Sequence, residues 1–166
     1  MELFILRHGK AEQRSPTIKS DSRRKLTKEG EKEIEDVADA LSSLKIKFNY
    51  IITSPLKRAK QTAEIVLKKC KETNSLVEWN ELKPESKTNA LYEKLSSLKI
   101  NSTVLLVGHD PFLSSMIGEI ITDGKNNCRV ILKKGGLAKI SLNSLKPKIN
   151  GELQWLIGPK QIKKLL

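Results

Sequence analysis

The sequence predicts an α/β fold with a mostly parallel sheet. Three short apolar runs, 3–6, 50–53 and 104–107, have the length and the Ile, Leu and Val content of buried strands. Helical patterns separate these runs, and connections through helices join parallel strands. At 166 residues the chain suits one domain and is short for two. We therefore expect a single domain over residues 1–166, with a return or antiparallel strand late in the chain.

The first elements are a strand, a long loop and a helix. We expect the strand over residues 2–7, and the polar segment 9–25 has the length of loops that act in function. Thr27 is a suitable N-cap for the helix that follows. Apolar residues at three- and four-residue steps predict the buried stripe of that helix: Ile34, Val37, Ala38, Leu41 and Leu44.

A second strand, 50–53, leads into a second helix. Ser54 is expected to be its N-cap, with Pro55 at the first helical position. Arg58 falls outside the apolar stripe and in the first turn, so it can point toward the end of the strand, where backbone N–H groups favour an anion. The stripe itself is expected to contain Leu56, Ala59, Ala63, Val66 and Leu67.

The second half continues the alternation and ends in strands. We expect a third helix at about 87–98, a strand that ends at Gly108, and a helix from Pro111. Three further apolar segments predict strands, with Gly135-Gly136 as a turn between the first two: 129–133, 137–142 and 153–157.

Composition limits the partners and the compartment. The net charge of +12 and the isoelectric point near 9.7 favour acidic or phosphorylated partners and are a first sign of nucleic-acid binding. The lysines are scattered, however, and no basic stripe with interleaved aromatic residues is present, so we favour a solvated surface over a nucleic-acid interface. No apolar run approaches the roughly 20 residues of a membrane span, which predicts a cytoplasmic protein without a membrane partner.

The two cysteines carry no predicted function. Cys70 and Cys128 make no disulfide framework and lie in no metal-ligand spacing. We expect two buried thiols in a reducing compartment. No metal or cofactor motif occurs in the sequence, so we expect neither.

The two histidines of the chain stand at predicted strand ends beside glycines. Arg7-His8-Gly9 follows the first strand, and His109 follows Gly108. Neutral imidazole is a nucleophile near physiological pH, and guanidinium forks match phosphate oxygens two at a time. Arg7, Arg58 and a protonated His109 could surround one phosphate without a metal, while Gly9 would let a ligand approach the backbone. Either histidine taken alone could be an ordinary capping or core residue, but their joint placement favours a phosphate site.

Four segments resemble the histidine phosphatase superfamily, in its order and approximate spacing: Leu6–Gly9, Leu26–Gly30, Thr53–Ala63 and Val107–His109. They cover residues 1 to about 112. The length, together with residues 80–84 and 154–160, is similar to the small SixA-type phosphohistidine phosphatases. The resemblance implies a three-layer α/β/α sandwich of the phosphoglycerate mutase type and a phosphorylated His8. It also implies that Arg7, Arg58 and His109 bind the phosphoryl group, with Arg24 as a further candidate for the pocket.

The proton donor for the leaving group is open. Larger members of the superfamily carry a carboxylate between the positions that Arg58 and His109 match, and Glu81 is the candidate here, with Glu85 behind it. Either residue could equally be a surface carboxylate. A leaving imidazole has a pKa of about 6.5, so a P–N bond needs less help from an acid than a phosphate ester does.

The substrate follows from the space around the site. Only about 30 residues separate the Arg58 helix from the strand near Thr103, which leaves little chain for a cap, although the loop 10–25 could close as a lid. An open site would admit phosphohistidine on another protein, which makes a metal-independent phosphohistidine phosphatase the leading prediction. Small phosphate monoesters are the alternative substrates, and a basic module that binds phosphate or nucleic acid without turnover is the alternative class.

Overall fold

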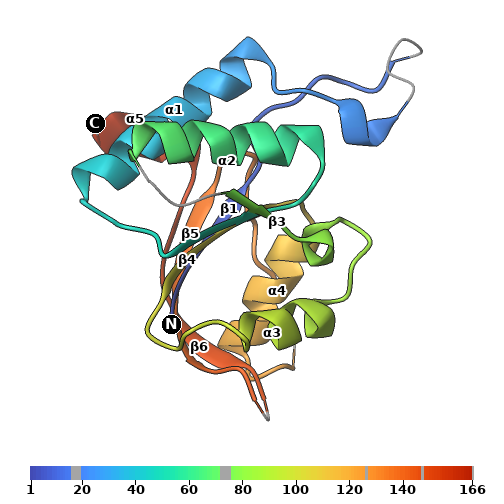
Figure 1. Ribbon diagram of the computed structural model, residues 1–166, viewed down its shortest axis with the longest axis vertical. Helices are drawn as coiled ribbons and strands as arrows, with labels where there is room; N and C mark the ends of the chain where they lie inside the picture. Colours follow the sequence, from blue (N-terminus) through green and yellow to red (C-terminus); the bar gives the residue numbers. More distant parts are fainter. Residues whose placement is uncertain (16–19, 72–75, 126, 147, 166) are drawn as a thin grey trace.

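The computed structural model describes residues 1–15, 20–71, 76–125, 127–146 and 148–165. Its centre is a six-stranded mixed sheet in the order β3-β2-β4-β1-β5-β6 (Figure 1). The strands are β1 (Glu2–Arg7), β2 (Tyr50–Thr53), β3 (Leu76–Glu78), β4 (Thr103–Gly108), β5 (Leu137–Ser144) and β6 (Asn150–Ile157). The first four run parallel, and β5 and β6 are antiparallel to their neighbours. The prediction of an α/β fold with a mostly parallel sheet and a late antiparallel return is confirmed.

Helices cover both faces of the sheet. They are α1 (Lys28–Ser43), α2 (Lys57–Lys69), α3 (Thr88–Leu95), α4 (Phe112–Ile121) and α5 (Pro159–Leu165). Successive side chains of a strand point to opposite faces. Accordingly Phe4 and Leu6 pack in a cluster with α1, α2 and α5, whereas Leu3 and Ile5 pack in a second cluster with α3 and α4. The result is the expected three-layer sandwich (Figure 1). None of the helices in the described residues is long and apolar enough to cross a membrane.

The register of the sheet collects several chain segments at one edge. Arg7 of β1 is paired with Gly108 of β4, and Val107 of β4 is paired with Thr53 of β2. The residues that follow these three strands therefore emerge side by side. The start of β5 and the end of β6 lie at the same edge, because Leu6 pairs with Leu137 and Leu137 with Ile157.

The predicted start of the second helix was wrong by two residues. The helix begins at Lys57, with Leu56 in the N-cap position. Ser54 does not cap it, because its backbone N–H continues the sheet by donating to Val107 O, and its hydroxyl contacts His109. The N-cap at Thr27 is confirmed, since its Oγ1 accepts a hydrogen bond from Gly30 N at 3.0 Å.

Four other expectations differ from the structure. Residues 129–133 form no strand, because β1 already has two neighbours and the carbonyl of Leu132 instead accepts the guanidinium of Arg7. Leu44 is exposed, since α1 ends one residue before it. Cys128 lies exposed in the irregular segment before β5, whereas Cys70 is buried as expected. The sequence analysis also missed β3 and α5, which have only three and seven residues.

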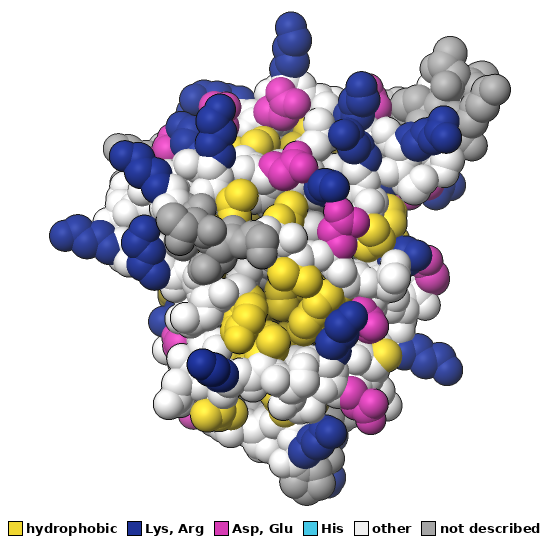
Figure 2. All heavy atoms as spheres, viewed as in Figure 1, with side chains coloured by type: hydrophobic (Ala, Val, Ile, Leu, Met, Phe, Trp, Pro, Cys, Tyr) yellow, Lys and Arg dark blue, Asp and Glu magenta, His cyan; other side chains and the backbone are white. Residues whose placement is uncertain are grey.

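The basic side chains are spread over the surface. Figure 2 shows Lys and Arg distributed over the whole of one face, without a continuous stripe. Some of the lysines in the described residues pair with carboxylates, among them Lys60 with Glu78 and Lys69 with Asp39. This distribution agrees with a solvated basic surface.

Candidate active site

His8 is held in one tautomer by its two neighbours. It follows β1, is 6% exposed, and its Nδ1 lies 2.7 Å from the carbonyl oxygen of Gly9. Its Nε2 lies 3.1 Å from Nε of Arg58. A carbonyl can only accept and a guanidinium can only donate, so the proton is on Nδ1 and the lone pair is on Nε2. The ring thus presents an unprotonated nitrogen to Arg58.

Burial keeps this imidazole neutral. Loss of solvation lowers the pKa of His8 to about 3, and the charges of His109, Arg58 and Arg7 act in the same direction, against the hydrogen bond to Gly9. A neutral imidazole retains the lone pair that a nucleophile needs. At neutral pH, His8 therefore requires no base to become reactive.

His109 lies beside His8 at the end of β4. The two ring centroids are 5.1 Å apart, and Nε2 of His109 is 2.8 Å from Oγ of Ser54. Burial, followed by the charge of Arg58, lowers the pKa of His109 to about 3, so the neutral form prevails in the free protein at neutral pH. Its Nδ1 is buried and has no hydrogen-bond partner among the described residues, which leaves it available to a ligand.

Arg58, in the first turn of α2, joins His8 to the long loop. Its side chain is buried, as few arginines are, and each of its three nitrogens donates a hydrogen bond. Nε donates to His8 Nε2, while Nη1 and Nη2 donate to the backbone oxygen and to Oδ2 of Asp21, both at 2.9 Å. The guanidinium edge that faces the nucleophile is therefore shared between His8 and a carboxylate.

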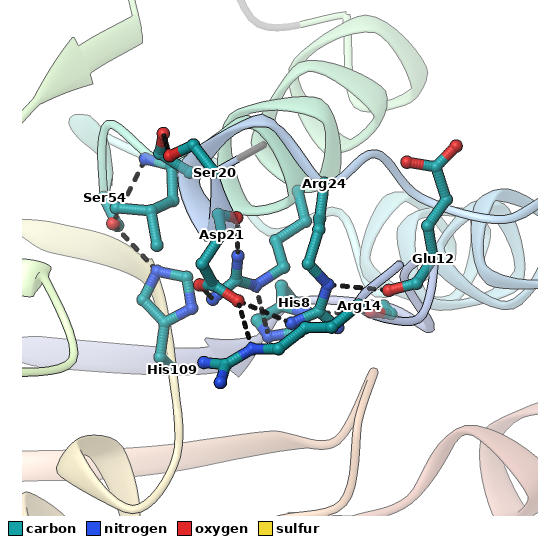
Figure 3. Close-up of polar contacts among 12 residues, drawn as sticks. His8, Glu12, Arg14, Ser20, Asp21, Arg24, Ser54 and His109 are labelled. Atoms are coloured by element: carbon teal, nitrogen blue, oxygen red, sulfur yellow. Dashed lines mark hydrogen bonds and ion pairs between the residues drawn. The ribbon is translucent and has the colours of Figure 1, made fainter. Parts of the chain in front are cut away.

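Asp21 is a site residue that the sequence analysis missed. Its Oδ1 accepts from Arg24 Nη1 at 2.8 Å and from Arg14 Nε at 3.4 Å, and Figure 3 shows both arginines converging on it. Partial burial raises its pKa, but the hydrogen bonds and charges of Arg24 and Arg58 outweigh this and bring it to about 2. The ionised carboxylate thus supplies the negative charge that the arginines would otherwise take from a phosphoryl group.

The other predicted residues fall in different places. Arg24 joins the cluster through Asp21 and also donates from Nε to the Glu12 carbonyl at 2.6 Å. Arg7 donates from Nη1 to the Leu132 carbonyl at 2.8 Å and forms an ion pair with Asp110 at 3.4 Å. Its Nε is buried without a partner in the described part of the chain, so it retains a free donor.

Gly9 is required by packing. A Cβ at this position would lie 2.8 Å from Ile34 Cγ1 and 2.9 Å from Gly30 O. The glycine thus brings the residues after β1 against the first turns of α1, where the sequence analysis had expected close approach to a ligand. Its N–H donates to Thr62 Oγ1 of α2 at 3.2 Å, which ties the same segment to the helix that carries Arg58.

Glu81 lies outside this network. It belongs to a short 3-10 helix, Asn80–Leu82, and pairs with Lys94 Nζ at 2.9 Å. The hydrogen bond from Lys94 lowers the pKa of Glu81, which is opposite to the change that a proton donor needs at neutral pH. Within the described ranges, the Glu81 side chain pairs with Lys94 and forms no hydrogen bond or ion pair with either histidine. Those ranges also hold no group of three or more His, Cys, Asp or Glu that could bind a metal ion.

Comparisons with known proteins bear on the family of this chain. The family model "Histidine phosphatase superfamily (branch 1)" matches residues 3–90. An uncharacterized protein of Picosynechococcus sp. is 35% identical over 166 residues, which cover 96% of this chain and 98% of that one. Phosphohistidine phosphatase SixA of Escherichia coli is 27% identical over 165 residues, which cover 98% of this chain and 97% of SixA.

Solved structures show the same likeness. The protein histidine phosphatase SixA complexed with tungstate superimposes with a TM-score of 0.86 at 27% identity, over 98% of this chain and 100% of that chain. The sequence match, the fold and the arrangement of His8, Arg58 and His109 lead to one conclusion. The chain belongs to the histidine phosphatase superfamily.

Proposed function

We propose that this phosphatase hydrolyses phosphohistidine on proteins, through a phosphorylated His8. The observation that carries the proposal is the lone pair of His8 Nε2, which is directed at the buried guanidinium of Arg58 by the hydrogen bond from Nδ1 to Gly9 O. Because a transferring phosphoryl group carries its charge on its equatorial oxygens, a fixed cation beside the nucleophile stabilises it.

The reaction has two displacements. The Nε–H of Arg58 first turns from Nε2 of His8 to a phosphoryl oxygen, which frees the Nε2 lone pair to attack phosphorus. The P–N bond of the substrate breaks, and the leaving imidazole nitrogen keeps the electron pair while solvent protonates the ring. Water then attacks phosphorus, the P–Nε2 bond breaks, and inorganic phosphate leaves while Nδ1–H of His8 remains on Gly9 O. The phosphoryl oxygens would replace the Asp21 carboxylate on Arg58, and Arg7 and Nδ1 of His109 offer further polar atoms.

The leaving group decides the substrate class. We do not assign its protonation to Glu81, because Lys94 holds that carboxyl ionised. A substrate imidazole can be protonated by solvent near neutral pH, since its pKa is about 6.5, and it then leaves as a neutral group, whereas a strongly basic alkoxide is a poor leaving group that needs help from an acid. Because Lys94 keeps Glu81 ionised, the site over the described residues suits phosphohistidine better than phosphate esters. The similarity to SixA, a phosphohistidine phosphatase, supports the same choice.

The test compares two substrates in the presence of a metal chelator. A peptide phosphorylated on histidine and an aryl phosphate are supplied to the wild-type protein and to His8→Ala, and released phosphate is measured. We expect release from the phosphohistidine peptide by the wild type only. Release from the aryl phosphate alone would move the substrate to small monoesters. No release from either substrate by folded wild type would indicate a module that binds without turnover.

A further inference from the structure

A second basic surface lies next to the nucleophile at the same sheet edge. Lys133 and Lys134 immediately precede the Gly135-Gly136 turn before β5, and Lys160 follows β6. These ends of the antiparallel strands β5 and β6 are paired with each other and with the end of β1. The three lysines, called the lysine surface below, are therefore placed on the β1 side of the edge, opposite the β2 side that carries Arg58.

A hollow of about 360 Å³ places the lysine surface beside Arg7, the neighbour of His8 in the chain. The basic residues among its lining are Arg7, Lys10, Lys133, Lys134 and Lys160. The one carboxylate of this lining, Glu33, is already paired with Lys10 at 2.9 Å, and Lys10 also pairs with Glu29. Among the described residues no carboxylate pairs with any of the three lysines, so the hollow carries uncompensated positive charge.

The backbone holds the lysine surface at a fixed position relative to His8. Gly135 N lies 3.1 Å from the carbonyl oxygens of both Arg7 and His8, and Gly136 O accepts from Arg7 N at 3.0 Å. Gly135 has φ +69° and a neighbouring Pro159, so the turn is closely packed against the start of α5. A group bound by these lysines would consequently lie near a phosphoryl group on His8, within the reach of the lysine side chains.

Lysine and arginine side chains favour different anionic ligands. The three lysines are exposed and on flexible stems, and each offers a point charge, whereas a single phosphate is held best by forked or buried donors such as Arg58. An adjoining hollow of about 300 Å³ shares Lys133 and is lined by Ile131, whose side chain is 78% exposed, and by Leu156. Separate charges next to exposed apolar surface fit several carboxylates on a protein better than a second phosphate.

We propose that the lysine surface docks an acidic surface of the substrate protein, next to its phosphohistidine. This proposal rests on the proposed function and specifies the substrate: a phosphohistidine flanked by Asp or Glu side chains is preferred over one in neutral surroundings. The charges on the enzyme and on the partner are complementary, so they favour encounter as well as affinity.

Binding is tested first, because it requires no turnover. A fluorescent, unphosphorylated peptide with glutamates around one histidine is titrated with wild type, with Lys133→Gln/Lys134→Gln/Lys160→Gln, and with Lys99→Gln/Lys146→Gln/Lys148→Gln. The control triple removes the same charge from exposed lysines at the opposite sheet edge, before β4 and between β5 and β6. We expect Kd to rise about ten-fold in the first triple at low salt, as loss of three exposed charge pairs implies, and to stay unchanged in the control.

Turnover separates this proposal from the proposed function. The phosphorylated glutamate peptide and its glutamine counterpart are compared by kcat/KM. The preference for glutamate should persist in the wild type and the control triple and disappear in Lys133→Gln/Lys134→Gln/Lys160→Gln. Equal Kd and equal preference in the two triples would overturn the docking surface while leaving the phosphatase intact. Absence of hydrolysis of either peptide, with the Kd difference retained, would instead overturn the phosphohistidine assignment.

Discussion

The two halves of the candidate site are held by different forces. His8, Ser54 and His109 stand at strand ends, are almost fully buried, and are positioned by the pairing of β1, β4 and β2. Asp21 and Arg24 stand on the loop before α1 and are positioned by ion pairs. A bound phosphoryl group can take over the arginine contacts that Asp21 now makes. No group of a substrate can take over the backbone pairing that positions His8, Ser54 and His109. We infer that the strand-end half determines the chemistry and the loop half determines how strongly anions bind.

The largest effect is expected at the nucleophile. His8→Asn keeps a polar side chain near Gly9 but removes the attacking nitrogen, so turnover of a phosphohistidine peptide should fall by about 10⁴-fold or more. Thermal unfolding measured in parallel serves as the control and should change little. Substantial activity in the folded variant would mean that the strand-end half does not carry the nucleophile.

Arg58 connects the two halves, and its loss should rank second. Arg58→Lys retains one charge but cannot donate simultaneously to His8 and Asp21, so kcat should fall by about 10²-fold. The matched control is Arg14→Lys, because the Arg14 side chain belongs to the loop half and is 82% exposed. Its kcat should remain within about three-fold of wild type. Equal losses in both variants would contradict the division into halves.

Acid is expected to destabilise the protein through the buried histidines of the strand-end half. The pKa of His8 and of His109 falls from 6.5 to about 3 on folding, so the unfolded chain binds more protons between these values. Stability is therefore lost as pH falls from about 6.5 toward 3, whereas Asp21 with its pKa of about 2 stays ionised over this range. The slope of unfolding free energy against pH, measured by urea titration between pH 6 and 4, should be smaller in His109→Gln. An unchanged slope would show that His109 is not buried in the neutral form.

Asp21→Asn tests the loop half. We expect a smaller effect than for the preceding variants, and a gain in phosphate binding instead of a loss of activity. Asp21→Asn removes the resident negative charge while preserving shape, so Arg58 and Arg24 are left for an external anion. Inhibition by inorganic phosphate should become about five-fold stronger, a modest gain because the Asp21 carboxylate is partly exposed and its ion pairs are partly screened. Phosphate inhibition that is weaker than in wild type would mean that Asp21 positions the arginines instead of competing for them.

The smallest effect is expected at Glu81. Because this carboxylate pairs with Lys94 and joins neither half, Glu81→Gln should change kcat for a phosphohistidine peptide by less than about two-fold. The same variant is measured on an alkyl phosphate, whose alkoxide leaving group depends most on an acid. A loss of kcat on the ester alone would restore Glu81 as the proton donor for poor leaving groups.

The same division explains what the sequence could predict. Strand ends are visible in a sequence, because apolar runs mark the strands and His8 and His109 directly follow them. Asp21 was not visible: it lies in a polar loop without periodicity, among several other charged residues. A signal was present in its spacing to Arg24, since a short 3-10 helix over Asp21–Arg23 brings the two into an ion pair three residues apart. Residues 16–19 of the proposed lid lie outside the described residues.

Residues 129–133 show the opposite case, in which a local sequence pattern predicted a strand that does not form. Residues 129–133 have the apolar content of a strand, but only Leu132 in this segment is buried, and its carbonyl is used by Arg7. A local pattern reports burial and cannot report that the neighbouring strand positions are already occupied by β4 and β5. Tertiary pairing decided against the local propensity here.

The central claim is that the phosphoryl group passes through His8, and trapping the phosphoenzyme tests it most directly. The wild-type protein is mixed with a phosphohistidine peptide, quenched in base, in which phosphohistidine is stable, and examined by intact mass and peptide mapping. The account predicts one phosphoryl group on His8 and none on His8→Asn. A phosphoryl group on another residue of the wild type, or turnover by folded His8→Asn at the wild-type rate, would contradict it.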